Sequence, residues 1–207
     1  PISQSRLFEE KFIVSNIPYK IVGGVNFYAR KEIKDLLAYL KTIDNARDDL
    51  AVRRIINVPK RGIGATTLNR VADYAAAADI SFYNALKMAD DIPTLGKSAA
   101  KIKPFVNFIQ VMRSKVEIIS VSELLQEIID ETGYVKELEA EDTEEAKARI
   151  ENIDELISKV VAYEEGEEHP TLSGFLEEVA LVADIDSLDD GSDYVVLMTL
   201  HSAKGLE

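Results

Sequence analysis

The 207-residue sequence contains no cysteine and only two histidines. A chain without cysteine can form no disulfide, no reactive thiolate and no cysteine zinc site, which suits the reducing cytoplasm where we expect this protein. The two histidines, His169 and His201, lie far apart in the sequence and do not form a metal-ligand pair. We therefore expect no bound metal.

Long apolar runs are also missing, although apolar residues make up 46% of the chain and charged residues 29%. No run approaches the ~18 residues that a membrane-spanning helix requires. The first residues lack the basic stretch and the following apolar stretch of a signal peptide. The composition is that of a globular chain long enough for one or two domains, and we expect no membrane association.

A loop for binding a nucleoside triphosphate is likewise absent. Gly96-Lys97-Ser98 imitates the end of such a loop, but Asp91 occupies the position of the required first glycine, and no apolar strand precedes it. Pairs of Asp and Glu are frequent between residues 137 and 168, but their spacing fits a solvated helix surface. With no complete catalytic constellation, the sequence does not support a free-standing enzyme.

Positive charge is scarce overall, since the formal net charge is −13. Its distribution is uneven. Residues 53–70 contain five basic residues and no acidic one, whereas residues 137–190 contain nineteen acidic and three basic residues, a local net charge of −16. Such polarisation along the chain indicates a basic binding face despite the acidic total.

Apolar periodicity predicts a mostly α-helical chain. A long helical block, roughly 25–190, lies between two short strands at 19–22 and 194–200. Helices are expected at 4–15, 30–43, 49–57, 66–78, about 81–89, 98–118, 121–131, about 142–165 and 172–183. Ser120 with Glu123, and Asp142 with Glu145, have the spacing of capping boxes.

Strands at both ends of a helical block suggest that a helical domain is inserted into a sheet-containing domain. The two connections would be the permissive pair Gly23-Gly24 and the polar stretch 188–193. Two adjacent crossings of this kind would form a natural hinge.

The segment from Asn57 to Leu68, N-V-P-K-R-G-I-G-A-T-T-L, is the first chemical motif. A helix ends, a tight turn with two glycines follows, and the next helix begins at about Ala65 or Thr66. Glycines allow close approach of a ligand, the new helix offers free N–H groups to an anion, and Lys60 and Arg61 supply charge. This helix-hairpin-helix-like pattern would grip a duplex phosphate backbone. The alternative is an ordinary corner in which Ile63 fills the core.

The second motif is the strand that runs from Tyr194 into the polar loop 201–207. Open α/β sheets place ligands at the carboxyl ends of strands, so His201, Lys204 and Glu207 could contact a phosphate, a ribose or a backbone. The alternative is that they are ordinary surface residues. The sequence stops within this loop, so we expect the chain to be a fragment whose site is completed elsewhere.

Taken together and in this order, the motifs resemble the second half of superfamily 1 DNA helicases of the UvrD/Rep/PcrA type, and among them the PcrA members of Gram-positive bacteria. The match covers nearly the whole chain. It rests on four segments: Gln4–Arg6, Ile17–Leu40, Arg54–Gly64 and Leu197–Glu207. The first segment is short, whereas the other three, in register, are highly specific.

The resemblance implies a domain organisation. Residues 1–24 and 191–207 would be parts of the RecA-like α/β subdomain 2A, truncated within the strand–loop motif. Residues 25–190 would be the helical subdomain 2B inserted between them. The glycine pair, Gly23 and Gly24, would be a hinge about which 2B swivels.

The resemblance also implies roles for individual residues. Arg6 would contact the γ-phosphate across an interdomain cleft, where an arginine can stabilise phosphoryl-transfer charge. Glu207 would contact the nucleotide, although Leu206-Glu207 also coincides with a residue pair that cloning often leaves behind. His201 and Lys204 would couple the nucleotide site to single-stranded DNA.

The turn would hold duplex DNA through six residues: Lys60, Arg61, Gly62, Ile63, Gly64 and Thr66. Family members hydrolyse ATP to move 3′ to 5′ along single-stranded DNA in repair or replication. ATP and Mg²⁺ are therefore the cofactors expected for the whole protein. The P-loop and the magnesium-binding motif are absent here, so the fragment, expected to be a monomer, should carry no cofactor and hydrolyse no ATP.

For the fragment itself, the sequence predicts weak duplex binding and a role in regulating unwinding. If all five basic residues of 53–70 met phosphates, the log–log salt slope would be roughly −4 to −5. Changing Lys60 and Arg61 to Glu should then abolish binding. The alternative is an acidic helical module that docks protein partners or folds back on its own helicase core, because the −16 segment repels DNA and attracts basic proteins.

Overall fold

The computed structural model describes residues 5–22, 27–187 and 195–198. It divides the chain into two compact units. Unit 1 comprises Pro1–Arg30 and Val179–Glu207, and unit 2 comprises Lys31–Glu178. Unit 2 is therefore one continuous stretch of sequence, and unit 1 consists of the two stretches that precede and follow it in the chain.

Unit 1 contains a helix, α1 (Ser5–Val14), and two strands, β1 (Tyr19–Val22) and β2 (Val195–Met198). The strands pair in parallel, with Tyr19 opposite Val195. A short 3₁₀ helix, η2 (Phe27–Ala29), follows β1. The helix expected at 4–15 and both expected strands are thus confirmed.

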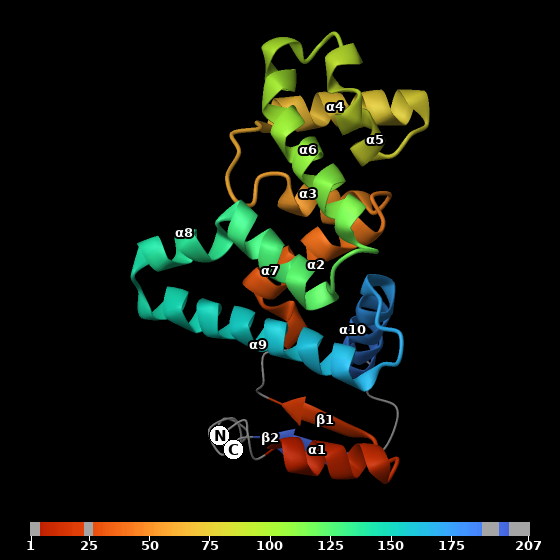
Figure 1. Cartoon of the computed structure of the whole chain (residues 1–207), viewed down its shortest axis with the longest axis vertical. Coiled ribbons are helices and arrows are strands. Elements are labelled where there is room, and N and C mark those ends of the chain that lie inside the picture. Colours follow the sequence, from red (N-terminus) through yellow and green to blue (C-terminus); the bar gives the residue numbers. More distant parts are fainter. Residues whose placement is uncertain (1–4, 23–26, 188–194, 199–207) are drawn as a thin grey trace. The chain divides into compact units, whose positions relative to one another are not determined.

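The regular secondary structure of unit 2 is helical in the described residues, and loops and turns join the helices (Figure 1). Its helices are α2 (Lys31–Asp44), α3 (Asp49–Ile55), α4 (Ala65–Ala78), α5 (Phe82–Lys87), α6 (Ala99–Lys115), α7 (Val121–Thr132), α8 (Tyr134–Glu141), α9 (Glu144–Gly166) and the start of α10 (Leu172–Ser187). Two 3₁₀ turns, η3 (Ala89–Asp91) and η4 (Gly96–Ser98), lie between α5 and α6. The prediction of a mostly helical chain is confirmed.

Helix α2 is the centre of unit 2, and it packs against α3, α6, α7 and α9 (Figure 1). Its apolar residues recur every three or four positions, and all are buried: Ile33, Leu36, Leu37, Leu40 and Ile43. This spacing places them along the core-facing side of the helix. The same helix also buries polar groups that join it to its neighbours.

Asp35 is the most connected of these buried groups. Its carboxylate accepts hydrogen bonds from Arg54 Nε of α3 at 2.8 Å, from Lys31 Nζ at 3.1 Å and from the Tyr134 hydroxyl of α8 at 2.7 Å. Burial, together with the adjacent carboxylate of Asp35, raises the pKa of Tyr134 far above its ordinary value. Arg54 is therefore engaged in joining α2 to α3.

Helix boundaries test the two predicted capping boxes. Ser120 and Glu123 form a complete box at the start of α7, as predicted. The prediction for Asp142 is wrong, because this residue ends α8 with a left-handed φ of 46°. Thr143 caps α9 instead, and its hydroxyl accepts a hydrogen bond from Ala146 N at 3.1 Å. Helix α8 was not predicted.

Several sequence predictions lie outside the described residues, namely the glycine pair at 23–24 and the stretch 188–193. In the part of the chain that is described, no helix is both long enough and apolar enough to cross a membrane.

Candidate nucleic-acid interface

The turn between α3 and α4 is held closed by side chains. The Asn57 amide donates to Ile63 O at 2.6 Å, and Asn57 Oδ1 accepts from Ile63 N at 3.1 Å. The Ile63 side chain is 3% exposed. The interpretation in which Ile63 fills the core is therefore correct for this side chain, which has no surface to offer a ligand.

Arg61 is committed to the same turn. Its guanidinium donates to the carbonyls of Ile55 at 2.8 Å and Ile56 at 3.1 Å, and to the Tyr39 hydroxyl at 2.6 Å. It also lies 5.0 Å from the ring centroid of Phe105. Burial raises the pKa of Tyr39, and the nearby Arg61 opposes that rise. Arg61 thus stabilises the turn and the end of α3, and its donors are engaged internally.

The remaining predicted residues of the turn face solvent. Lys60, Gly62, Gly64 and Thr66 are exposed. Gly62 adopts a left-handed φ of 70°, which favours glycine. Gly64 has an ordinary extended conformation, with φ −73° and ψ 160°, and a Cβ there would meet nothing within 4 Å. Neither conformation nor internal packing therefore requires glycine at position 64.

Gly64 is also the N-cap of α4, and it supplies no side-chain cap. The first hydrogen bond of the helix runs from Leu68 N to Gly64 O at 3.1 Å. Among the described residues, the N–H groups of Ala65, Thr66 and Thr67 have no protein acceptor. The N-terminal end of α4 therefore presents three unpaired N–H donors to solvent, next to a residue without a side chain.

Lys101 is a residue of this surface that the sequence reasoning missed. It lies on the first turns of α6, and its Nζ donates to Gly62 O at 3.3 Å. This contact places a second exposed lysine beside the turn that contains Lys60. No pattern in the sequence indicates this role, since thirty-nine positions separate Lys101 from Gly62.

The other three basic residues of 53–70 have internal partners. Arg54 pairs with Asp35, Arg53 lies over the Phe82 ring at 5.0 Å, and Arg70 donates to Thr94 O at 2.6 Å. These three side chains, although close in sequence, therefore contact three different parts of unit 2. The cations beside the open end of α4 are Lys60 and Lys101.

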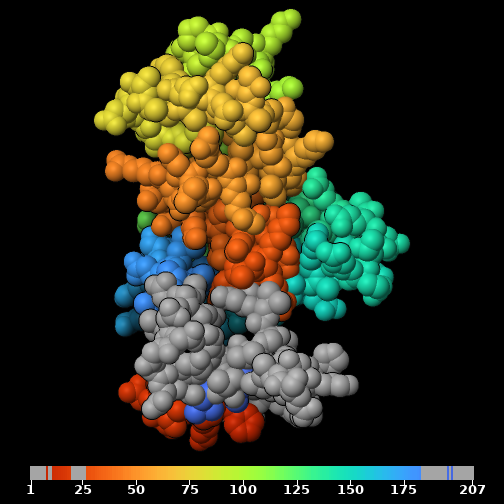
Figure 2. Space-filling model, turned by 180° about the vertical axis from the view of Figure 1, so that it is seen from behind, coloured from red at the N-terminus to blue at the C-terminus, as the bar shows by residue number. Residues whose placement is uncertain are grey.

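The face of unit 2 that carries this turn is visible from behind. Figure 2 shows the stretch from α3 through α4, coloured orange to yellow, at the surface of the unit, with the α8–α9 stretch in teal to one side.

Among the described residues, no group of three His, Asp or Glu side chains could hold a metal ion.

The other predicted site residues belong to unit 1. His201, Lys204 and Glu207 lie outside the described residues, as do Gly23 and Gly24. Arg6 belongs to α1.

Comparison with known proteins identifies the family. Residues 2–207 match the family described as UvrD-like helicase C-terminal domain. The chain is 46% identical over 211 residues to the ATP-dependent DNA helicase PcrA of Bacillus subtilis (strain 168), an alignment that covers 99% of this chain and 29% of the relative. It is 46% identical over 207 residues to PcrA of Staphylococcus aureus (strain Mu50), covering 99% and 28% respectively.

PcrA of Staphylococcus epidermidis (strain RP62A) is 45% identical over 207 residues, with coverages of 99% and 28%. The chain therefore spans less than a third of the length of these relatives. The match over nearly every residue shows that the chain belongs to the UvrD-like helicase C-terminal domain family.

Proposed function

We propose that this chain is part of an ATP-dependent DNA helicase that unwinds DNA in the 3′ to 5′ direction, and that unit 2 is its 2B subdomain. In this proposal unit 1 belongs to the RecA-like subdomain 2A, into which 2B is inserted. The family membership and the names of its relatives support the helicase assignment. The contribution of unit 2 is to hold the duplex backbone and thereby to regulate unwinding.

The observation that carries the duplex contact is Gly64. Neither the φ angle nor internal packing requires glycine at this position. Because Gly64 has no side chain, a ligand can reach the unpaired N–H groups at the start of α4. The helix dipole and these donors favour a phosphate at this end. Lys60 and Lys101 add charge without the geometry of base recognition, so the contact is to the backbone.

The nucleotide chemistry belongs to the whole protein. ATP and Mg²⁺ are its proposed cofactors, with Arg6 at the γ-phosphate and Glu207 at the nucleotide. His201 and Lys204 would link that site to single-stranded DNA. The present chain has no triphosphate-binding loop in its sequence, so we expect no ATP hydrolysis from it alone.

The test is duplex binding by the 207-residue chain, followed by fluorescence anisotropy of a short labelled duplex. Wild type should bind with a Kd on the order of 10⁻⁴–10⁻⁶ M at moderate salt. Gly64→Ala should weaken binding about tenfold, because a methyl group at the helix end displaces a charge-assisted hydrogen bond. Lys60→Gln should make the log–log salt slope shallower by about 0.9.

Two matched variants serve as controls. Gly166→Ala changes another glycine with open space around it, and Lys147→Gln removes an exposed lysine of α9. Both should bind like wild type. Equal DNA affinity for Gly64→Ala and Gly166→Ala would show that the α4 terminus does not hold phosphate.

A further inference from the structure

A second group of cations lies on unit 2 and does not belong to the turn. Arg47 follows α2, Lys87 is the last residue of α5, and Arg113 lies in the last turn of α6. The three line one open pocket of about 230 Å³. Arg113 is about 18 Å along the α6 axis from Lys101, because the two are twelve residues apart.

The neutral polar side chains that line this pocket can all donate hydrogen bonds. Asn45 Oδ1 already accepts from Arg47 N at 3.1 Å, which leaves its NH₂ group as the free part of the amide. Ser81 Oγ accepts from Asn84 N at 3.1 Å, so its hydroxyl hydrogen is available. With Asn84, three donor-bearing side chains stand among the three cations.

The cations of this pocket, Arg47, Lys87 and Arg113, take part in no ion pair among the described residues, in a chain of net charge −13. Three carboxylates are near Arg47 in sequence, and none of them lines the pocket. Asp44 accepts from Ser173 Oγ at 2.5 Å, Asp48 from Ala51 N at 3.1 Å and Asp49 from Phe82 N at 3.0 Å.

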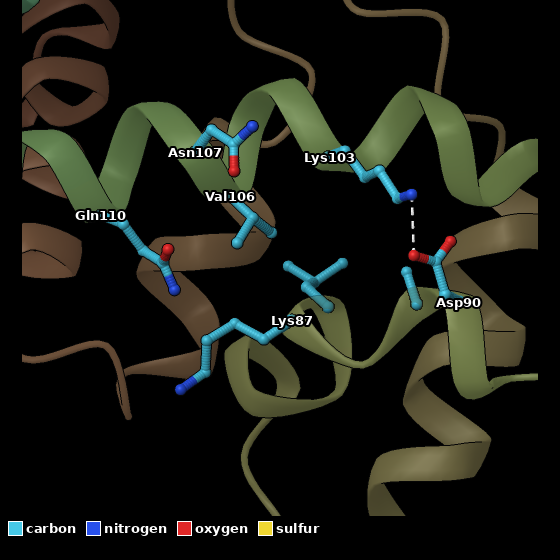
Figure 3. Close-up of a pocket in the computed structure, with 8 residues that line it drawn as sticks. Lys87, Asp90, Lys103, Val106, Asn107 and Gln110 are labelled. Carbon is cyan, nitrogen blue, oxygen red and sulfur yellow. Dashed lines mark ion pairs between the residues drawn. The ribbon is translucent and has the colours of Figure 1, made fainter.

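An adjacent pocket of about 240 Å³ provides a contrast (Figure 3). Its lysine, Lys103, is neutralised by Asp90 at 2.7 Å. Lys87 also lines this pocket, and Figure 3 shows its ammonium directed away from the Lys103–Asp90 pair. Of the two pockets, the one lined by Arg47 and Arg113 is therefore the one whose cations form no ion pair among the described residues.

Tyr83 lies under one of the cations, Lys87. Its side chain is 2% exposed, and Lys87 Nζ lies 5.7 Å from its ring centroid. Burial raises the pKa of the Tyr83 hydroxyl, and the positive charge of Arg113 partly opposes this rise. The buried ring of Tyr83 therefore gives the Lys87 ammonium a fixed surface at the edge of this pocket.

We propose that the pocket of Arg47, Lys87 and Arg113 binds a phosphate-class oxyanion, as a second phosphate site separate from the α4 terminus. Donors from three elements suit a tetrahedral anion with several oxygens, and arginine suits the fork geometry of phosphate. The phosphate could belong to a nucleic-acid backbone or to a small phosphate ligand, because both present the same chemistry. This inference does not depend on the contact at Gly64.

The test follows the side-chain amide NMR signals of Asn45 and Asn84 in the 207-residue chain during titration with inorganic phosphate. Saturable shifts of these signals are expected. Arg113→Gln should weaken phosphate binding about tenfold, the loss of one charge-assisted contact, and Arg47→Gln should act in the same direction. Arg149→Gln, which changes an arginine of α9, should leave the titration unchanged.

Further arms identify the source of the phosphate and separate the two sites. A short duplex that shifts the same signals would assign the pocket to the nucleic-acid backbone, and shifts with inorganic phosphate alone would assign it to a small ligand. Lys60→Gln should preserve the phosphate titration even if duplex binding falls. Non-saturating shifts, an unchanged titration in both arginine variants, or a response to an acidic peptide but not to phosphate would overturn the proposal.

Discussion

At the residue scale, the partner of a cation decides what the cation does. Arg61 is next to Lys60 in sequence, yet its donors are directed inward to Ile55 O, Ile56 O and Tyr39, while Lys60 is exposed. The sequence predicted a basic turn correctly. It could not separate these roles, because Tyr39 and Phe105 lie far from the turn in sequence.

Arg61→Lys is expected to destabilise unit 2 by about 2 kcal/mol or more, although the charge is kept. A lysine cannot reproduce the guanidinium contacts with two carbonyls and a hydroxyl, and the carbonyls would lose charged donors. Urea unfolding followed by circular dichroism measures the change. A charge reversal at Arg61 would therefore report on folding as well as on DNA.

The matched substitution is Lys60→Arg, which changes an exposed neighbour and should leave the free energy of unfolding within about 0.5 kcal/mol of wild type. If Arg61→Lys were equally stable and only its DNA affinity fell, Arg61 would be a phosphate contact after all.

At the element scale, periodicity predicted most of the helices because their buried residues recur every three or four positions. The capping residue of α9 was predicted one position too early. Asp142 and Thr143 are both good capping types, and only the backbone shows that Asp142 ends α8 while Thr143 begins α9. Helix α8 is short, with Tyr134 and Leu138 as its buried residues, so its sequence carries little periodic signal.

Thr143→Ala should lower the free energy of unfolding by about 1 kcal/mol, since α9 loses its side-chain cap. Asp142→Gly should be neutral or slightly stabilising, because glycine tolerates the left-handed φ of 46° at that position. Chemical denaturation of the two single variants provides the comparison. The reverse order of stabilities would restore Asp142 as the capping residue.

At the scale of the whole molecule, net charge describes this chain poorly. Ten of the nineteen acidic residues of 137–190 lie in α8 and α9. Within the described part of the chain, the open end of α4 instead carries unpaired N–H donors, and the Arg47 pocket carries cations without ion pairs. The uneven charge could be predicted from the sequence. The grouping of Lys101 with the turn, and of Arg47 with Lys87 and Arg113, could not, because the packing of α6 creates both.

Neutralising the acidic face separates the DNA-binding role from the alternative of a protein-docking module. Glu139 and Glu141 of α8 and Glu151 of α9 are exposed and form no ion pair within the described residues. Changing all three to Gln should leave duplex affinity unchanged or raise it by roughly threefold at low salt, an effect that screening removes at high salt. Anisotropy titrations at two salt concentrations measure this. The same variant should bind a basic peptide more weakly if the face docks proteins, and weaker duplex binding would place the acidic helices inside the DNA site, contrary to the contact proposed at Gly64.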